Sequence, residues 1–254
     1  MIHIKSADGI KKMRESNRII AVLFEKLREY VKPGISTWEL AVIAEDFIRS
    51  EGASPSFKGY TVSGLSPFPG AICSSVNSCI VHGIPSKRTI LKEGDIIGID
   101  VGTLKNGYHG DAAFTYNVGK ISKEASDLMD ITKKALEIGI SKAVAGSRVG
   151  DISYAIGSFV KSKGYYVADN LTGHGIGREL HEDPMIPNSG TKGKGARLKK
   201  GMTLAIEPMV NIGTNRVYEK GWEFFVQDKS LSAHYEHTIL ITDGEPEKLS
   251  ELRV

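Results

Sequence analysis

The stretch PGISTWELAVIAEDFIRSEGA (33–53) has a counterpart 112 residues later, AGSRVGDISYAIGSFVKSKGY (145–165). Gly34 matches Gly146, and the same order of apolar and charged residues runs through both copies. Such self-similarity indicates a duplicated structural unit. We therefore expect a single domain over 1–254 with an internal repeat of about 7–119 and 123–243.

A longer amphipathic run precedes each copy, with apolar residues at helical spacing over 10–30 and 128–138. Each half is therefore predicted to begin with a helix, a glycine turn and a second helix. Gly34 and Gly146 are predicted to be the C-terminal caps of the first helices, and Thr37 and Asp151 are predicted to cap or charge-stabilise the start of the second helices.

Short apolar runs separated by turn residues follow each helix pair, which is typical of strands. The runs are DIIGIDVG (95–102), GDAAFTYNVG (110–119), GMTLAIEPMV (201–210), WEFFVQD (222–228) and EHTILITD (236–243). Two copies of helix, helix and strands predict an α+β fold. In it, two pseudo-symmetric halves share a mainly antiparallel sheet with helices on one face, and the other face is free for a site.

Composition predicts a soluble globular protein, with 41% hydrophobic and 25% charged residues. Charges interrupt every apolar stretch of 1–30, so we expect neither a signal peptide nor a membrane span, and we place the protein in the cytoplasm. A reducing compartment makes Cys73 and Cys79 free thiols. The net charge is only +3, so the basic run 190–200 is interpreted as a solvated loop and not as a nucleic-acid patch.

Four of the predicted strand segments hold an acid in an apolar setting: Asp100 in IGIDVG, Asp111 in HGDAAF, Glu207 in LAIEPM and Glu236 in HYEHTI. Burying a lone carboxylate costs several kcal/mol. Separate salt bridges would need buried lysines or arginines, and these strands contain none. One shared cationic site explains the four acids together.

The stretch LTGHGIGRELHEDP (171–184) adds a histidine to this set. Its glycines do not fit a dinucleotide fingerprint, and His174 and His181 are too far apart for a zincin motif. Carboxylates with one imidazole suit Mn, Fe(II), Co or Zn, and the excess of carboxylates indicates two metal ions. We interpret the glycines around His174 as letting the backbone approach these ions.

Six separated motifs resemble the type I methionine aminopeptidases of the pita-bread fold, from the first helix to about residue 243. They are VHGIP (81–85), the Asp100 and Asp111 pair, NLTGHGIG (170–177), LHEDP (180–184), AIEP (205–208) and YEHT (235–238). The resemblance implies removal of the initiator methionine from nascent proteins and peptides, with a preference for a small second residue. The implied chemistry is hydrolysis by a metal-bridged hydroxide.

The resemblance also implies roles for individual residues. The ligands of two divalent ions (Co, Mn, Fe(II) or Zn) would be Asp100, Asp111, His174, Glu207 and Glu236, with Asp111 and Glu236 bridging the ions. Glu207 would also collect a proton. His82 and His181 would be catalytic histidines that are not ligands; they would hold the substrate and stabilise the transition state.

A pocket for the methionine side chain needs aromatic and sulfur groups. The candidates are Tyr60, Phe68, Cys73 and Trp222, and Phe68 and Cys73 match the pocket segment of the resembled family. Each of the four also fits an ordinary core role.

Two positions depart from the family pattern. Gly102 stands where a hydroxyl residue is common, and a hydrogen bond that would support the metal site is then missing or supplied by water. His234 stands where glutamine is frequent, and we expect it at the surface or behind the ligands, in preference to a sixth ligand. Ile2 is bulky, so an enzyme that requires a small second residue would leave Met1 in place.

Three alternatives are weighed against this reading. X-Pro peptidases share the fold and the ligands but carry a large extra N-terminal domain, and type II enzymes have an insertion between the two glutamates, which here are 29 residues apart (236 minus 207). A binding module would have lost ligands. The expected partners are N-terminal methionine peptides and nascent chains, with no DNA or membrane. We expect a monomer, and a transient ribosome contact through 192–200 stays open.

Overall fold

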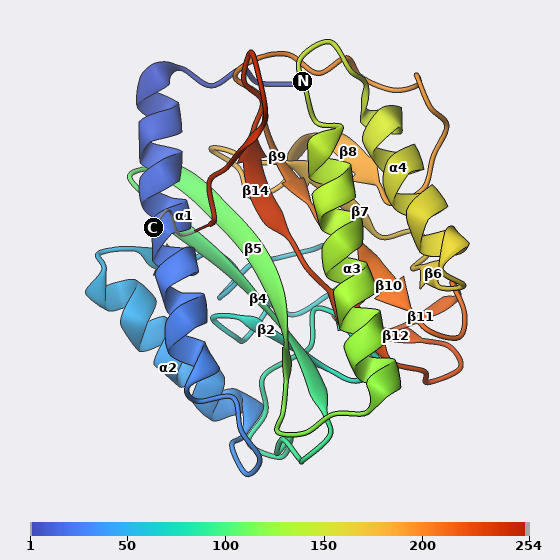
Figure 1. Ribbon diagram of the computed structural model, residues 1–254. Coiled ribbons are helices and arrows are strands. Elements are labelled where there is room, and N and C mark those ends of the chain that lie inside the picture. The colour runs from blue at the N-terminus through green and yellow to red at the C-terminus, as the bar shows by residue number, and fades with distance from the viewer. Residues whose placement is uncertain (1, 252–254) are drawn as a thin grey trace.

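Four helices lie on one side of the strands in the computed structural model, which describes residues 2–251 (Figure 1). The expectation about Met1 and the last residues of the predicted domain lie outside this range. The helices are α1 (Ala7–Arg28), α2 (Thr37–Ser50), α3 (Lys123–Ser141) and α4 (Val149–Ser162). None of the helices in this range is long and apolar enough to cross a membrane.

The strands form four hydrogen-bonded sheets, and all described strand pairs are antiparallel. The first contains β1 (Ser54–Pro55), β2 (Cys73–Val76), β4 (Ile96–Lys105) and β5 (Tyr108–Asn117). The second contains β6 (Tyr166–Val167), β10 (Met209–Asn211) and β13 (Ser232–His234), and the third contains β3 (Cys79–Val81), β11 (Val217–Lys220) and β12 (Glu223–Val226). The fourth contains β7 (Thr172–Gly175), β8 (Glu182–Pro187), β9 (Thr203–Ile206), β14 (His237–Leu240) and β15 (Glu247–Lys248).

The predicted strand 201–210 is divided into β9 and β10, because Glu207 and Pro208 interrupt it and proline cannot donate to a ladder. The segment that pairs with this one is interrupted at the same level, between β13 and β14, at Tyr235 and Glu236. Both segments therefore pass from one sheet to another at the two glutamates. These breaks divide the single sheet expected from sequence and leave both carboxylates outside the ladders.

Asp151 stabilises the start of α4 as predicted, because its side chain accepts from the Arg148 N–H at 2.8 Å, but the other predicted caps were wrong. Ser36, not Thr37, caps α2, through a capping box with Glu39. The first helices end several residues before Gly34 and Gly146. Those glycines instead have φ of 94° and 93° in the following turns.

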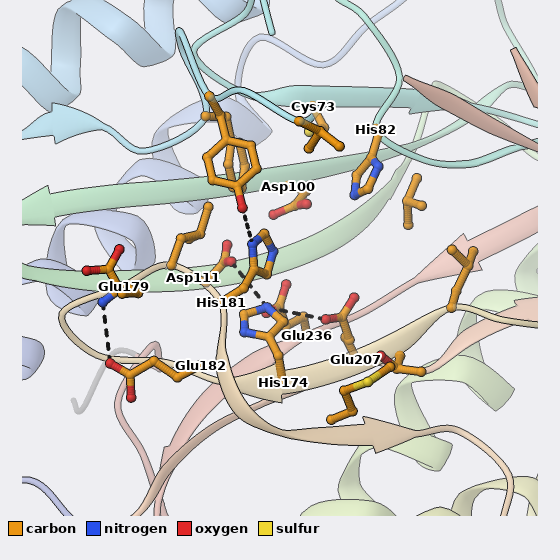
Figure 2. Close-up of a pocket in the computed structure, with 18 of the residues that line it drawn as sticks. Cys73, His82, Asp100, Asp111, His174, Glu179, His181, Glu182, Glu207 and Glu236 are labelled. Atoms are coloured by element: carbon orange, nitrogen blue, oxygen red, sulfur yellow. Dashed lines mark hydrogen bonds and ion pairs between the residues drawn. The ribbon is translucent and has the colours of Figure 1, made fainter. Parts of the chain in front are cut away.

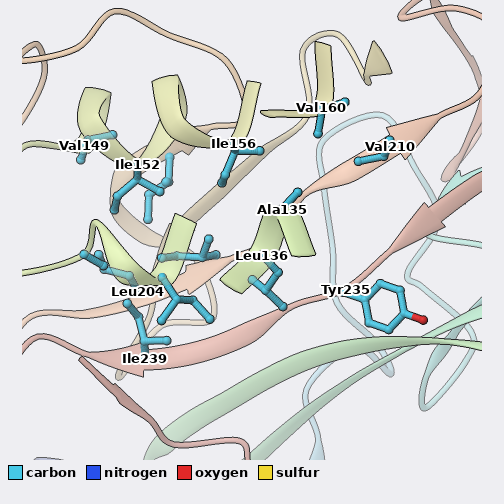
Figure 3. Packing of buried hydrophobic residues seen from close by; sticks show 14 of the residues in the cluster. Ala135, Leu136, Val149, Ile152, Ile156, Val160, Leu204, Val210, Tyr235 and Ile239 are labelled. Carbon is cyan, nitrogen blue, oxygen red and sulfur yellow. The ribbon is translucent and has the colours of Figure 1, made fainter. Parts of the chain in front are cut away.

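Each helix pair covers its own apolar cluster. In the first half, α1 packs on β4 and β5, and α2 packs on α1, β1 and β2. In the second half, Ile152 and Ile156 of α4 and Leu136 of α3 lie over strand residues such as Leu204 and Ile239 (Figure 3). Burying such side chains stabilises the fold by roughly 1.5 to 3 kcal/mol each, and the helices leave the far side of the strands open.

The two halves are joined at the edge of β5. The Glu236 N–H donates to the Ala113 carbonyl oxygen at 2.9 Å. The Thr238 hydroxyl donates to the Asp111 carbonyl oxygen at 2.7 Å and accepts from the Asp111 N–H at 3.2 Å. These bonds fix an acid from each half beside the other.

Candidate functional site

The predicted ligand residues all meet at one cavity of about 720 Å³. Asp100 comes from β4, Asp111 from β5 and His174 from β7, while Glu207 and Glu236 occupy the strand breaks. Figure 2 shows these five side chains pointing toward one another. Folding thus assembles positions that are up to 136 residues apart in sequence (236 minus 100).

The ring of His174 is oriented by its own backbone neighbour. Its Nδ1 lies 2.8 Å from the Gly175 carbonyl oxygen, which can only accept, so Nδ1 carries the proton. The free lone pair of Nε2 then faces Asp111 Oδ2 at 3.8 Å and Glu207 Oε1 at 3.6 Å. Burial lowers the pKa of His174 to about 3, so the ring is neutral and suited to bind a metal.

Asp111 and Glu236 are buried, Asp100 and Glu207 are half-buried, and the four acids have no lysine or arginine partner within residues 2–251. Within residues 2–251, their only ion-pair distances are to histidines. Burial raises the pKa of Glu207 to about 8 and that of Asp100 to about 7. Burial, followed by the charge of a neighbouring acid, raises the pKa of Asp111 and Glu236 well above the usual range. Ionising this cluster therefore requires added positive charge.

The donor set fits divalent metal ions. Asp100 Oδ1, Asp111 Oδ1 and Glu236 Oε1 are buried and accept no hydrogen bond from residues 2–251. Ligand atoms of Asp111, His174 and Glu236 lie within 4.8 Å of one another, a spacing that one ion can bridge. Buried acceptors with no donor are costly unless a cation pairs with them.

The raised carboxyl pKa values predict how metal stabilises the fold. Folded metal-free protein keeps protons on Glu207 and Asp100 that the unfolded chain has lost, so its stability falls as pH rises toward 8. The histidines with lowered pKa values change the pH dependence of stability only below pH ~6.5, the ordinary pKa of histidine. Calorimetry should therefore show a larger metal-induced rise in melting temperature at pH 8 than at pH 6.5. The corresponding difference in the free energy of stabilisation by metal is on the order of 1 kcal/mol. Equal rises at both pH values would contradict this.

The glycines beside His174 serve strand packing, and the interpretation that they let the backbone approach metal ions stays a prediction. A Cβ on Gly173 would lie 2.4 Å from the Ala205 carbonyl oxygen, and one on Gly175 would lie 2.1 Å from the Asp183 carbonyl oxygen. The neighbouring backbones of β9 and β8 thus leave no room for a side chain at either position.

Gly102 is also explained by packing. A Cβ there would lie 2.8 Å from the Phe57 ring and from the Ser56 side chain. The aromatic ring fills the space that a hydroxyl side chain would need, so no protein hydroxyl at 102 supports the acids of β4 and β5.

His181 lies directly above His174, with ring centroids 4.5 Å apart (Figure 2). The Tyr60 hydroxyl is 2.8 Å from His181 Nδ1 and fixes the orientation of the ring. Burial lowers the pKa of His181, so its ring is neutral. His181 is therefore held at the mouth of the acid cluster without being part of it.

His82 lies on the other side of Asp100 in Figure 2. Its φ is 58°, an uncommon backbone conformation for a residue that is not glycine. Its ring packs edge-on against Phe224 at 5.4 Å, and burial lowers its pKa to about 4. Backbone strain at a neutral, half-buried histidine in a cavity is typical of functional sites.

The apolar wall of the cavity includes the predicted pocket residues Tyr60, Phe68, Cys73 and Trp222. The rings of Phe68 and Trp222 meet edge-on at 5.6 Å, and Tyr60 lies 6.4 Å from Trp222. Burial raises the pKa of the Cys73 thiol, which keeps it neutral.

Two further lining residues, Phe57 and Leu180, were missed by the sequence analysis. Leu180 directly precedes His181. Its position next to a predicted catalytic residue is a signal in the sequence that could have identified it. Phe57 has no such signal, because its place depends on packing against Gly102. Cys73 and Cys79 are buried free thiols, as predicted.

His234 is not at the surface. Its side chain is 3% exposed, and its Nε2 lies 3.4 Å from Glu207 Oε2. Strand alternation puts His234 on the same face as Glu236, which agrees with its place beside the cluster, whereas the expected surface position was wrong.

Comparison with known proteins places the chain in a family. Residues 11–243 match the sequence model of metallopeptidase family M24. The chain belongs to this family. Membership in M24 identifies it as a metal-dependent peptidase, in agreement with the donor set described above.

Relatives within M24 agree over the full length. The methionine aminopeptidase of Clostridium acetobutylicum is 48% identical over 252 residues, which cover 98% of this chain and 99% of the relative. A crystal structure of methionine aminopeptidase from Thermotoga maritima has a TM-score of 0.96 and 43% identity, and the match covers 99% of this chain and 100% of that one. The expected pita-bread fold is thereby confirmed.

The alternative family branch is more distant. A prolidase from Pyrococcus furiosus has a TM-score of 0.80 at 23% identity, which shows a shared fold alone. The match covers 99% of this chain but 66% of the prolidase, so the prolidase contains a region that this M24 chain does not match.

Proposed function

We propose that this protein removes the N-terminal methionine from nascent proteins and peptides whose second residue is small. The observation that carries the proposal is a set of five ligand-type side chains at the floor of a cavity with an aromatic wall: the buried Asp111, His174 and Glu236 and the half-buried Asp100 and Glu207. Full-length similarity to proteins named methionine aminopeptidase supports the same activity.

The proposed cofactors are two divalent ions (Co, Mn, Fe(II) or Zn), held by those five side chains. Asp111 and Glu236 would hold both ions, because each lies at the junction of the two halves. When bound, the ions supply positive charge that polarises the scissile carbonyl and lowers the pKa of water.

The remaining roles fall to groups of the chain itself. Glu207 accepts the proton of the attacking water on a carboxylate oxygen and passes it to the departing amine. With the Tyr60 hydroxyl donating to Nδ1 of His181, Nε2 of that ring carries the proton. This N–H would donate to the substrate oxygen as it becomes negative, a contribution of about 3 kcal/mol. His82 would hold the substrate backbone from the opposite wall.

Selectivity for methionine would come from the apolar wall. Phe68, Trp222 and Tyr60 present ring edges and faces, and the neutral Cys73 thiol lies beside them. Aromatic rings and sulfur contact a thioether favourably. The unbranched methionine side chain fits a narrow pocket between such rings better than a branched one.

We expect the protein to act as a single catalytic domain and a monomer, on nascent chains in the cytoplasm. The basic side chains of 192–200 are solvent-exposed, so the solvated-loop interpretation and a ribosome contact there both stay hypotheses.

A peptide panel tests the proposed specificity. Metal-loaded protein should release methionine from Met-Ala and Met-Gly peptides at least about 100-fold faster than from Met-Lys, because a long second side chain displaces the scissile bond. An Ala-Pro peptide serves as the control for X-Pro cleavage. Amino-acid analysis after timed incubation gives both rates, and preferential release of alanine from Ala-Pro would overturn the assignment.

A further inference from the structure

The side chain of His234 faces the acid cluster, yet the mechanism proposed above does not use it. His234 ends β13, where its backbone pairs with Met209 of β10. Both strands lead directly to the breaks that carry Glu207 and Glu236. The histidine therefore enters the cluster from the second half of the fold, close to both glutamates.

The backbone of His234 is held by one threonine of the opposite half. The Thr115 hydroxyl donates to the His234 carbonyl oxygen at 2.7 Å and accepts from the His234 N–H at 3.0 Å. Thr115 is fully buried in β5, four residues after Asp111. This clamp ties the position of the imidazole to the strand that carries a candidate ligand.

The geometry around His234 matches that of a metal site. Ligand atoms of Glu207, His234 and Glu236 all lie within 4.8 Å of one another, and this group shares Glu236 with the group of Asp111 and His174. Atoms that bind one ion at ~2.0 to 2.2 Å lie about 3 to 4 Å apart. Small side-chain movements would bring the three groups onto one ion.

A hydrogen bond does not account for this arrangement. The groups that face His234 are the carboxylates of Glu207, Glu236 and Asp100. Nε2 makes no hydrogen bond within residues 2–251, and its 3.4 Å separation from Glu207 Oε2 is long for one. A buried imidazole nitrogen that makes no hydrogen bond and lies among carboxylates is placed as a metal ligand would be.

We propose that His234 is a sixth protein ligand of the divalent metal centre, binding through Nε2 beside Glu207 and Glu236. This inference rests on the metal centre of the proposed function. Each of the two ion positions then has its own imidazole, His174 at one and His234 at the other. Imidazole suits Zn, Co and Fe(II) better than Mg or Mn, so His234 shifts the preference of the second position toward those ions.

Proton NMR of protein loaded with two equivalents of Co(II) tests the proposal without measuring activity. Each imidazole bound to Co(II) gives an N–H proton shifted far outside the normal range. Wild type should show two such signals, and His234→Gln should show one. His237→Gln is the matched control: its imidazole is half-buried and bonds to Ser250, so both signals should remain.

Calorimetric titration with Co(II) supplies a second readout. His234→Gln should bind the second ion at least about tenfold more weakly and the first ion nearly unchanged. One shifted signal in wild type, or two in His234→Gln, overturns the proposal while leaving the metal centre intact. Failure of wild type to bind Co(II) at all overturns both this inference and the proposed function.

Discussion

The Glu207→Gln protein is expected to lose at least about 100-fold of its peptidase activity together with bound metal. Glu207 Oε1 faces His174 and Oε2 faces His234, so one substitution disturbs both ion positions. Removing even a group that only supports a metal ligand typically lowers metal affinity or activity by about 10- to 100-fold. The variant also loses the carboxylate that accepts the proton of water. Metal content by mass spectrometry and turnover of a Met-Ala peptide measure the two losses.

Glu179→Gln provides the matched control for this change. Glu179 also lines the cavity, but Figure 2 shows it away from the acid cluster. The control should keep both ions. Full metal content in Glu207→Gln as well would remove that residue from the ligand set and contradict the account of the cluster.

The His181→Ala protein should keep its metal and lose turnover by about 100- to 1000-fold, the usual effect of removing one donor to a developing oxyanion. The ring of His181 packs on His174 but contributes to neither group of ligand atoms. The loss should fall mainly on kcat, because the donor acts on charge that appears in the transition state. Metal analysis and steady-state kinetics on the same sample separate the two effects.

Tyr60→Phe refines this test. It removes the hydroxyl that holds His181 Nδ1 and leaves the aromatic ring in the pocket wall. Its kcat should fall less than that of His181→Ala, since the histidine remains but is no longer oriented. Loss of metal from His181→Ala would instead place that histidine among the ligands.

Much of the fold was predictable from the sequence because its signals are local or repeated. The match of 33–53 to 145–165 predicted the two helix pairs, and alternating apolar runs predicted β4, β5 and β14. The acids Asp100 and Asp111 stood out because a carboxylate in an apolar strand is expensive. The structure places them in one cavity with the other predicted ligands, whose binding of metal stays a prediction.

What escaped sequence reasoning depends on contacts between distant segments. A side chain at position 102 is excluded by the ring of Phe57, and a side chain at position 173 is excluded by the backbone of Ala205. The strand break at Glu207 was missed because its apolar flanks read as one continuous strand, although Pro208 signals the end of a ladder. His234 could not be assigned because its surroundings are set by Thr115 and Glu207, over 25 residues away in sequence.

The most direct test of the account is the release of methionine from a Met-Ala peptide by one protein sample in two states. The sample is first stripped of metal with a chelator and assayed in metal-free buffer, and then assayed again after two equivalents of Co(II) or Mn(II) are added. Free methionine and the shortened peptide are quantified by mass spectrometry. We predict no release above background from the stripped protein and full release after metal is restored. Equal release in both states would contradict a metal-dependent aminopeptidase built on the five-residue cluster.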